Sequence, residues 1–470
     1  MDPRLGSVRR DVRRAAPRAL RQLEEWLRIP SISGDPARTA DVARATAWVV
    51  DLLRGCTSEV AVHRATAGPV VVARTPGRRR GAPVTLVYGH LDVKAPGPGW
   101  TTPPFVPTRR PGRLQARGAS DDKGQLMPHL AALQAWCAAG GPPGDVVTVV
   151  DGAEEVGSPG LARVLRQVRA GTRRPEVVLV LDTRAAGPGR PSLTLSQRGA
   201  LPLSVTVETG GGPVHAGRLG GAVVDPSLEL AAALLRGARA AASLTAGCTV
   251  RAASPTRADV NQAARGRALL HTDLVAATTR RGALTVSRLH AGAARGAVPT
   301  RAGAVIDVRL PPGADPGRAL STLVTALRHG LPSGVRLRVR PGTPSRGACL
   351  EPDPRAVAAV RAACVAGFGR GPVTASSGGS VQAVRVLART FGTTPILLGL
   401  GPIDDGAHGP DEHLDLDDWT RALDTHAVLL DTVVSAGPRA KFARVPSSAR
   451  RATLYSVDSW GSRDKASGVT

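Results

Sequence analysis

Short runs of apolar, mostly β-branched residues recur through the first part of the chain, each bounded by turn residues. The runs lie at 69–75, 84–90, 146–155 and 177–183. Their nearly continuous apolar character predicts strands that are buried on both faces. Apolar residues at helical spacing predict helices at 9–28, 39–54, 123–140 and 160–171. Because strands and helices alternate, we expect an α/β layer with a mostly parallel sheet.

The pattern changes near residue 199. The predicted elements are then, in order, a strand at 200–209, a helix at 226–238, strands at 283–292 and 302–312, a helix at 317–330 and a strand at 335–342. This β-α-β-β-α-β order is typical of a compact two-layer α+β unit. A helix at 354–369 and a strand at 394–401 then return to the α/β pattern.

These changes predict one α/β domain with a second domain inserted into it. We expect the α/β domain to comprise 1–198 and 344–437, and the inserted α+β domain to comprise 199–343. Residues 438–470 are polar, basic and rich in Ser and Arg. For that segment we expect a poorly ordered tail.

The net charge of the chain is strongly positive, at +25, which raises the question of nucleic-acid binding. Nearly all of the basic residues are Arg, however, and they are scattered among Ala, Gly and Pro. Aromatic residues make up only 3% of the chain, so stacking platforms for bases are scarce. No zinc-finger spacing occurs either, and we therefore expect no nucleic-acid partner.

Membrane and disulfide signals are also weak. No run of about 18 apolar residues occurs, and the charged N-terminal segment lacks the apolar stretch of a secretory signal. No two cysteines stand at CxxC spacing, and their odd number argues against a disulfide framework. The five cysteines are at positions 56, 137, 248, 349 and 364. We expect them to be small buried side chains in a cytoplasmic protein.

Three of the predicted strands end in side chains that can bind metal or transfer protons. His90 and Asp92 follow the second strand, Glu154 and Glu155 follow the third, and Asp182 ends the fourth. Open α/β sheets place their ligands beyond the carboxyl ends of the strands. These residues are therefore expected to converge on one site.

Two loop motifs carry further candidates. In "GRLQARGASDDKGQ" Asp121 and Asp122 precede a predicted helix, and in "GPIDDGAHGPDEH" His408 follows a predicted strand. Each has a simpler explanation, because Asp is a common helix cap and a single loop His is commonly inert. Adjacent glutamates are likewise usually a solvated surface. Glu154 and Glu155, however, follow a buried strand and precede a glycine turn, which is a poor place for a solvated surface.

Taken together, these residues match the ligand set of a site for two metal ions. The candidate ligands are His90, Asp121, Glu155, Asp182 and His408. If Asp121 bridges, each ion receives one His, one terminal carboxylate and the shared carboxylate, with a position left for water. Glu154 then remains as a general base, since that role needs a carboxylate that is not a ligand. Asp92 would orient the His90 imidazole.

The order of these motifs resembles the family of co-catalytic zinc peptidases and deacylases. The matching motifs are "GHLDV", "PPF", "GRL", "RGASDDKGQ", "EEVGSPG", "LDT", "VHAG", "DVRLPP", "GGS" and "DDGAHGPDE". The resemblance extends over roughly residues 10–436. That family includes carnosinase-like dipeptidases, glutamate carboxypeptidase, acetylornithine deacetylase and succinyl-diaminopimelate desuccinylase. The segment "WTTPPFVPTRRPGRLQARGASDDKGQ" is most similar to the carnosinase-like branch.

The resemblance implies the same metal-site roles and adds others. It implies that His90 and Asp182 bind one metal and that Glu155 and His408 bind the other, with Asp121 between them. It also implies that the inserted domain acts as a lid and dimerisation domain, and that His215 of "VHAG" polarises the scissile carbonyl, often from the other subunit of a homodimer. The substrate-contacting positions it implies are Arg309, Gly379 and Ser380.

Some positions depart from the family pattern. Ser376 and Ser377 stand where relatives commonly have Arg-Glu, Gly296 stands for an Asn, and Asp225 stands for another Asn. None of these is a metal ligand, so the departures bear on substrate choice. Arg198 and Arg301 are candidates for holding a terminal carboxylate.

We therefore expect a hydrolase with two divalent metal ions, zinc first and cobalt or manganese as alternatives. The expected reaction is cleavage of an amide or peptide bond of a small substrate, as in a dipeptidase. Two alternatives remain open, a deacylase of N-acyl amino acids and a catalytically inactive relative that binds metal. An inactive relative would lack a metal ligand or the general base of the family, and this sequence lacks none of them.

Overall fold

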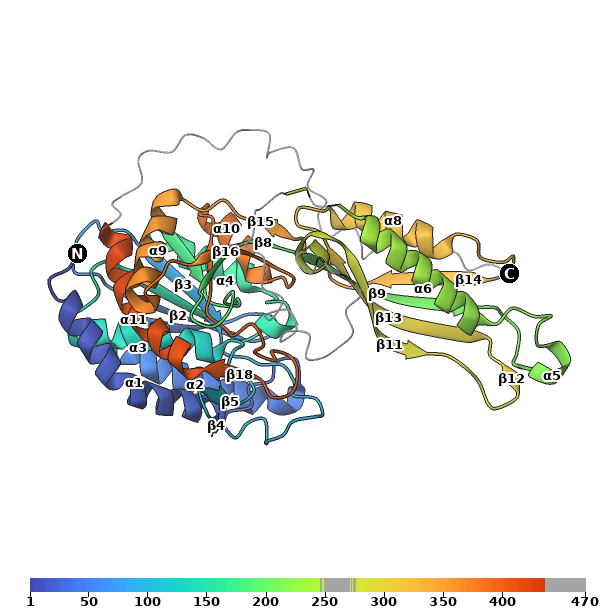
Figure 1. Cartoon of the computed structure of the whole chain (residues 1–470), viewed down its shortest axis with the longest axis horizontal. Coiled ribbons are helices and arrows are strands. Elements are labelled where there is room, and N and C mark those ends of the chain that lie inside the picture. The colour runs from blue at the N-terminus through green and yellow to red at the C-terminus, as the bar shows by residue number, and fades with distance from the viewer. Residues whose placement is uncertain (246, 249–270, 272, 274–275, 436–470) are drawn as a thin grey trace. The chain divides into compact units, whose positions relative to one another are not determined.

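The computed structural model describes residues 1–245, 247–248, 271, 273 and 276–435, so the predicted tail at 438–470 lies outside the described residues. The larger of the sheets has nine strands (Figure 1). Their order is β1-β2-β6-β3-β7-β17-β8-β15, and β16 also pairs with β8. Its strands are β1 (Val60–Arg64), β2 (Pro69–Thr75), β3 (Thr85–His90), β6 (Val146–Asp151), β7 (Val177–Val180), β8 (Ser192–Gln197), β15 (Ala348–Cys349), β16 (Val373–Ser377) and β17 (Ile396–Gly399).

The sheet is mixed rather than mostly parallel, although the α/β fold class is confirmed. Strands β6, β3, β7 and β17 run parallel to one another. On one side of this parallel group, β2 runs antiparallel to β6, and β1 runs antiparallel to β2. On the other side, β8 runs antiparallel to both β17 and β15. The parallel centre matters for function, because the carboxyl ends of β3, β6 and β7 lie at one edge of the sheet.

Helices cover both faces of this sheet. Alternate strand residues point to opposite faces, so Val71 and Ala73 lie in one apolar cluster while Val70 and Val72 lie in another. The first cluster is completed by α1 (Leu5–Leu27), α2 (Thr39–Arg54), α3 (Lys123–Ala138), α9 (Pro354–Phe368) and α11 (Leu416–Ser435). The second is completed by α4 (Leu161–Ala170) and α10 (Gln382–Phe391).

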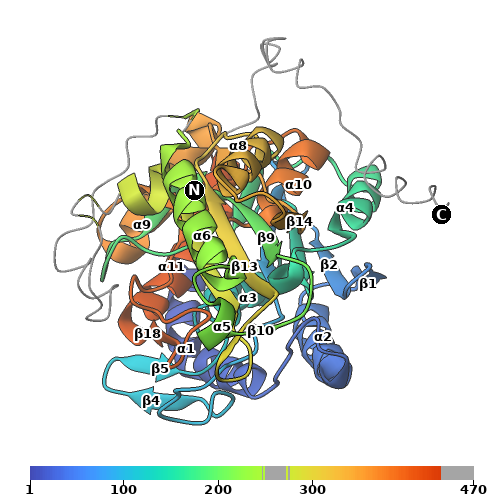
Figure 2. The same ribbon diagram turned by 90° about the vertical axis from the view of Figure 1, so that its right-hand side faces the viewer.

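A separate four-stranded antiparallel sheet has the order β11-β13-β9-β14. Its elements are β9 (Gly199–Glu208), α6 (Pro226–Ser243), β11 (Ala283–His290), β13 (Arg301–Leu310), α8 (Pro316–Arg328) and β14 (Arg336–Pro341). This is the expected β-α-β-β-α-β order. Leu203, Val205 and Val207 of β9 share one apolar cluster with residues of α6 and α8, so both helices cover the same face (Figure 2). The boundaries of an inserted domain at 199 and 343 stay a prediction.

Small elements complete the described fold. A two-stranded sheet joins β10 (Val214–His215) to β12 (Ala297–Val298), and α5 (Ala216–Leu219) follows β10. A three-stranded sheet joins β4 (Thr108–Arg110), β5 (Arg113–Gln115) and β18 (His413–Asp415).

The expectation that the cysteines are unpaired is wrong for two of them. Cys248 and Cys349 form a disulfide across a sequence separation of 101 residues. Their Cα atoms lie 6.3 Å apart, and a pairing between residues so distant in sequence leaves no local spacing signal. Cys56, Cys137 and Cys364 are free. Among the described residues, no helix has the length and apolar character needed to cross a membrane.

Candidate active site

The ends of three neighbouring parallel strands bring the predicted site residues together. His90 is the last residue of β3 and lies beside Asp151, the last residue of β6. Glu154 and Glu155 follow β6 in a short 3₁₀ turn, and Asp182 lies just beyond β7. Their proximity follows from the register of the sheet, because β3 and β6 end side by side and Val180, the last residue of β7, pairs with Tyr88, so that Asp182 comes level with His90.

His90 is fully buried and lies between two carboxylates. Its Nδ1 lies 3.0 Å from the carbonyl oxygen of Asp92 and 3.4 Å from the Asp92 Oδ1. Its Nε2 lies 3.0 Å from the Asp121 Oδ1 and 3.9 Å from the Asp182 Oδ2. Burial alone would lower the pKa of His90, but its hydrogen bonds to Asp121 and Asp92 hold that pKa well above its usual value.

Asp92 has a second contact that the sequence did not suggest. Its Oδ1 accepts the Glu154 N–H at 3.1 Å, and its Oδ2 accepts the Glu155 N–H at 3.0 Å. The Asp92 side chain is completely buried. Asp92 therefore contacts two parts of the site, the His90 imidazole and the turn that carries both glutamates.

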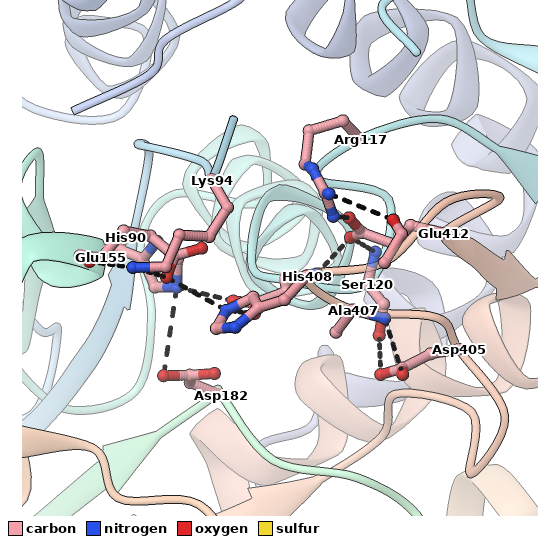
Figure 3. Close-up of polar contacts among 12 residues, drawn as sticks. His90, Lys94, Arg117, Ser120, Glu155, Asp182, Asp405, Ala407, His408 and Glu412 are labelled. Carbon is pink, nitrogen blue, oxygen red and sulfur yellow. Dashed lines mark hydrogen bonds and ion pairs between the residues drawn. The ribbon is translucent and has the colours of Figure 1, made fainter. Parts of the chain in front are cut away.

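Asp121 connects the strand ends to the loop that carries His408. Its two carboxylate oxygens point to different imidazoles, with His90 Nε2 3.0 Å from Oδ1 and His408 Nε2 3.0 Å from Oδ2. His408 Nε2 also lies 3.1 Å from Glu155 Oε2 (Figure 3). Asp122 is not a simple cap, because its Oδ2 accepts the buried His90 N–H at 3.0 Å and its side chain caps no helix N–H.

The cluster concentrates acidic groups in a largely buried place. Burial raises the pKa of Glu154 to about 8, although His90 opposes this change. Burial also raises the pKa of Asp182 well above its usual value, with the Asp121 charge adding to the effect. Carboxylates crowded together in this way favour a bound cation, because the cation stabilises their ionised forms.

The donor atoms form two groups, and each group suits one divalent metal ion. One group comprises His90, Glu154 and Asp182, the other comprises Asp121, Glu155 and His408, and the ligand atoms within each lie within 4.8 Å of one another. Imidazole nitrogen with carboxylate oxygen is a typical set for zinc and similar ions. The first group includes Glu154, to which the sequence assigns proton transfer rather than binding.

The remaining predicted residues lie elsewhere in the described structure. His215 ends β10, is exposed, and its Nδ1 accepts the Gly217 N–H at 3.0 Å. Arg309 on β13 pairs with Asp307 at 2.9 Å. The Gly379 N–H donates to Ser377 Oγ at 3.1 Å, and Ser380 is partly buried. Among the contacts of the described residues, none joins any of these residues to the histidine–carboxylate cluster.

The two arginines considered for carboxylate binding differ sharply. Arg198 is 9% exposed and donates to the carbonyl oxygens of Gly378 and Ala277, both at 3.2 Å. Burial, with the nearby Arg309 charge, lowers the pKa of Arg198 to about 10. Arg301 is exposed and lies 3.7 Å from Glu208.

Several polar residues around the cluster were not identified from the sequence. Lys94 Nζ lies 3.3 Å from Glu155 Oε2 and also donates to the Glu155 carbonyl oxygen. Arg117 and Glu412 form a buried ion pair beside Asp121. Their motifs, "RGASDDKGQ" and "GPDEH", could be seen in the sequence, but nothing local indicates that the two residues meet.

Comparison with known proteins shows that the sequence of this chain is similar to those of peptidases. The chain is 25% identical over 399 residues to the Cys-Gly metallodipeptidase dug1 of Schizosaccharomyces pombe, a match that covers 79% of this chain and 84% of the relative. It is 36% identical over 152 residues to the cysteinylglycine-S-conjugate dipeptidase of Corynebacterium striatum, covering 32% and 33%.

Solved structures share the fold. The dipeptidase Dug1p of Saccharomyces cerevisiae superposes with a TM-score of 0.78 at 22% identity, covering 93% of this chain and all of that one. Human carnosine dipeptidase 1 gives the same TM-score at 20% identity, covering 92% and 99%. The model of peptidase family M20/M25/M40 matches residues 86–432, which include every candidate metal ligand. The chain is therefore a metallopeptidase and belongs to peptidase family M20/M25/M40.

Proposed function

We propose that this protein is a dipeptidase that uses two divalent metal ions. The observation that supports this most directly is the position of Asp121, whose two oxygens reach the two imidazoles at 3.0 Å each. A carboxylate so placed would be shared between two ions. The names of the relatives, which include Cys-Gly and β-Ala-His dipeptidases, point to dipeptides as the substrate class.

The proposed ligands divide between two ions. His90 and Asp182 would hold one, Glu155 and His408 the other, and Asp121 would bridge them. Zinc is the proposed metal, with cobalt and manganese suited to the same donors. The ions would polarise the scissile carbonyl and make the attacking water more acidic.

Glu154 is the proposed general base and acid. The Asp92 carboxylate accepts the Glu154 backbone N–H at 3.1 Å. Glu154 lies close to the ligand atoms of His90 and Asp182, so its carboxylate would stand beside a water held by the ions. Glu154 would take a proton from the attacking water and then deliver it to the nitrogen of the leaving amine. Asp92 is proposed to orient His90 and the glutamate turn together.

Substrate contacts are proposed for four residues outside the cluster. His215 would polarise the substrate carbonyl, and its exposure leaves the ring free to reach a ligand. Arg309, Gly379 and Ser380 would contact the substrate. The Arg309 side chain is 34% exposed, and Gly379 is exposed.

A substrate panel tests the proposal. Zinc-loaded protein would be assayed with Cys-Gly, β-Ala-His and other dipeptides beside the matching N-acetyl amino acids. We expect release of free amino acids from at least one dipeptide. Cleavage of the acyl compounds alone would contradict the dipeptidase proposal and would assign deacylation to the same site. Absence of hydrolysis with two zinc ions bound would contradict both.

We also propose a homodimer formed through the second sheet. The edge strand β11 is exposed along most of its length, with Val286 42% and Leu289 59% exposed. On the adjacent helix α6, Leu228 and Leu235 are 70% and 62% exposed and stand on one face, seven residues apart. Within the described sheet β11 pairs only with β13, and such an edge beside exposed leucines suits a second copy of the chain. Sedimentation should show a dimer for the wild type and a monomer for Leu235→Glu, and a dimeric variant would contradict this placement.

A further inference from the structure

The loop that carries His408 contains turns but no helix or strand between β17 and β18. His408 itself is 54% exposed, so little packing holds its ring. Its Nε2 nevertheless lies within 3.1 Å of both Asp121 and Glu155. Other residues must therefore fix the loop relative to Asp121.

Arg117 and Glu412 are placed to do this. Arg117 Nη1 donates to Glu412 Oε2 at 2.5 Å, and the two side chains are 1% and 0% exposed. A buried ion pair is expensive to desolvate and is weak support for stability alone. Such a pair therefore calls for a further explanation, and its other hydrogen bonds supply one.

Each partner holds the backbone next to a proposed metal ligand. The Glu412 Oε1 accepts the N–H of Ser120 and the N–H of Asp121, both at 2.9 Å. Arg117 Nη2 donates to the carbonyl oxygen of Gly409, the residue after His408, at 3.1 Å. The pair thus joins the Asp121 peptide to the His408 loop. Figure 3 shows Arg117 beside Glu412, with Ser120 next to them.

Asp405 adds a second connection between the same segments. Its Oδ2 accepts the Ser120 hydroxyl at 2.8 Å, and its Oδ1 accepts the Ala407 N–H at 3.0 Å. Arg184, two residues beyond Asp182, lies 3.0 Å from the Asp405 Oδ1. The His408 loop is therefore tied both to the Asp121 segment and to the segment after β7.

We propose that Arg117 and Glu412 are positioning residues that set the separation of Asp121 and His408, and so control binding of the second metal ion by Asp121, Glu155 and His408. This inference rests on the proposed two-metal function. Both ions would share Asp121, but the other ligands of the first ion are His90, the last residue of β3, and Asp182, two residues beyond β7, whereas the second ion needs His408 of the loop. Loss of the pair should thus weaken the second site more than the first.

The test is calorimetric titration of zinc into the full-length, metal-stripped chain. Wild-type protein should bind two zinc ions. In Glu412→Gln, the amide oxygen still accepts the two N–H groups but the charge facing Arg117 is lost, and one site should weaken by about tenfold. The double variant Arg117→Leu/Glu412→Leu removes all of these bonds without leaving a buried charge, and one site should weaken by about 100-fold.

Asp404→Asn is the matched control, because Asp404 lies in the same loop but pairs with the partly exposed Arg113 at 2.9 Å. It should bind both ions as the wild type does. Circular dichroism verifies that each variant folds. If the double variant does not fold, the zinc titration of Glu412→Gln alone tests the inference. Unchanged affinity at both sites, or equal loss at both, would overturn the inference while leaving the proposed function intact. A wild type that binds no zinc would reject the proposed function and the inference with it.

Discussion

Two histidines, His129 and His426, are fully buried, and a buried histidine makes the stability of the fold depend on pH. His129 on α3 and His426 on α11 lie with ring centroids 5.9 Å apart. His129 Nε2 lies 3.0 Å from Thr148 Oγ1, whereas neither ring nitrogen of His426 has a hydrogen-bond partner among the described residues. Burial lowers the pKa of His426 to about 4 and lowers that of His129 well below its usual value.

The pH prediction follows from proton linkage. Unfolded His426 binds a proton near pH 6.5, whereas the folded form resists protonation down to about pH 4. Between these values the unfolded state holds more protons, so the free energy of unfolding should fall as the pH falls. The loss is on the order of 3 kcal/mol for this one group.

We predict that His426→Leu makes the stability of the metal-free protein less sensitive to acid. Urea midpoints at pH 7 and pH 4.5 should differ by less in the variant than in the wild type. His329→Gln, at an exposed position, is the control and should leave the difference unchanged. Equal sensitivity of His426→Leu and wild type would contradict this account.

Among the secondary-structure elements, the start of α3 is the one on which the site depends most directly. The helix begins at Lys123, directly after Asp121 and Asp122. A Cβ added at Gly124 would lie 1.7 Å from the carbonyl oxygen of Ala119 and 2.9 Å from Leu414. Only glycine therefore allows the helix to approach the segment that carries Asp121.

Gly124→Ala should both destabilise the protein and disturb metal binding. The backbone contact cannot relax by a side-chain rotation, and overpacking of this kind costs about 1–3 kcal/mol or more. Gly212→Ala is the control, because nothing lies within 4 Å of its added Cβ. Chemical denaturation and zinc titration would be compared, and a variant that matches the control in both would show that this contact is unimportant.

Elements with a strong local pattern could be predicted from the sequence, and others could not. Strands β2, β3 and β6 are apolar on both faces, so their runs were visible. Helix α11 was missed, because its buried positions include Asp424, His426 and Asp431, which interrupt an apolar pattern. The antiparallel β8 was also missed, and with it the mixed character of the sheet.

The candidate site was predictable in part. Residue type and a position after a buried strand predict His90, Glu155 and Asp182 as ligands, and the structure brings these side chains into one cluster. Their roles stay predictions. The ties between loops were not predictable, since Arg117 and Glu412 are 295 residues apart and meet only in the folded chain. His215, Arg309 and Ser380 remain predictions from the family resemblance.

At the scale of the whole molecule, the Cys248–Cys349 disulfide links the segment after α6 to strand β15. Closing a loop of about 100 residues should stabilise the folded chain by about 2–5 kcal/mol, chiefly by restricting the unfolded state. We predict that Cys349→Ser lowers the melting temperature, whereas Cys56→Ser, at a free and partly buried cysteine, does so by less. Thiol titration of the denatured, unreduced wild type should find the three free cysteines, and five reactive thiols would contradict the pairing.

The central claim is that a two-metal site uses Glu154 for proton transfer, and Glu154→Gln tests it most directly. Zinc content and turnover of a cleaved dipeptide should be measured on the same preparation of wild type and variant. We predict that the variant keeps two zinc ions per chain and loses about 10²- to 10⁴-fold in kcat, because its amide cannot exchange the proton. A variant that binds both ions and retains turnover within about tenfold of the wild type would contradict the account.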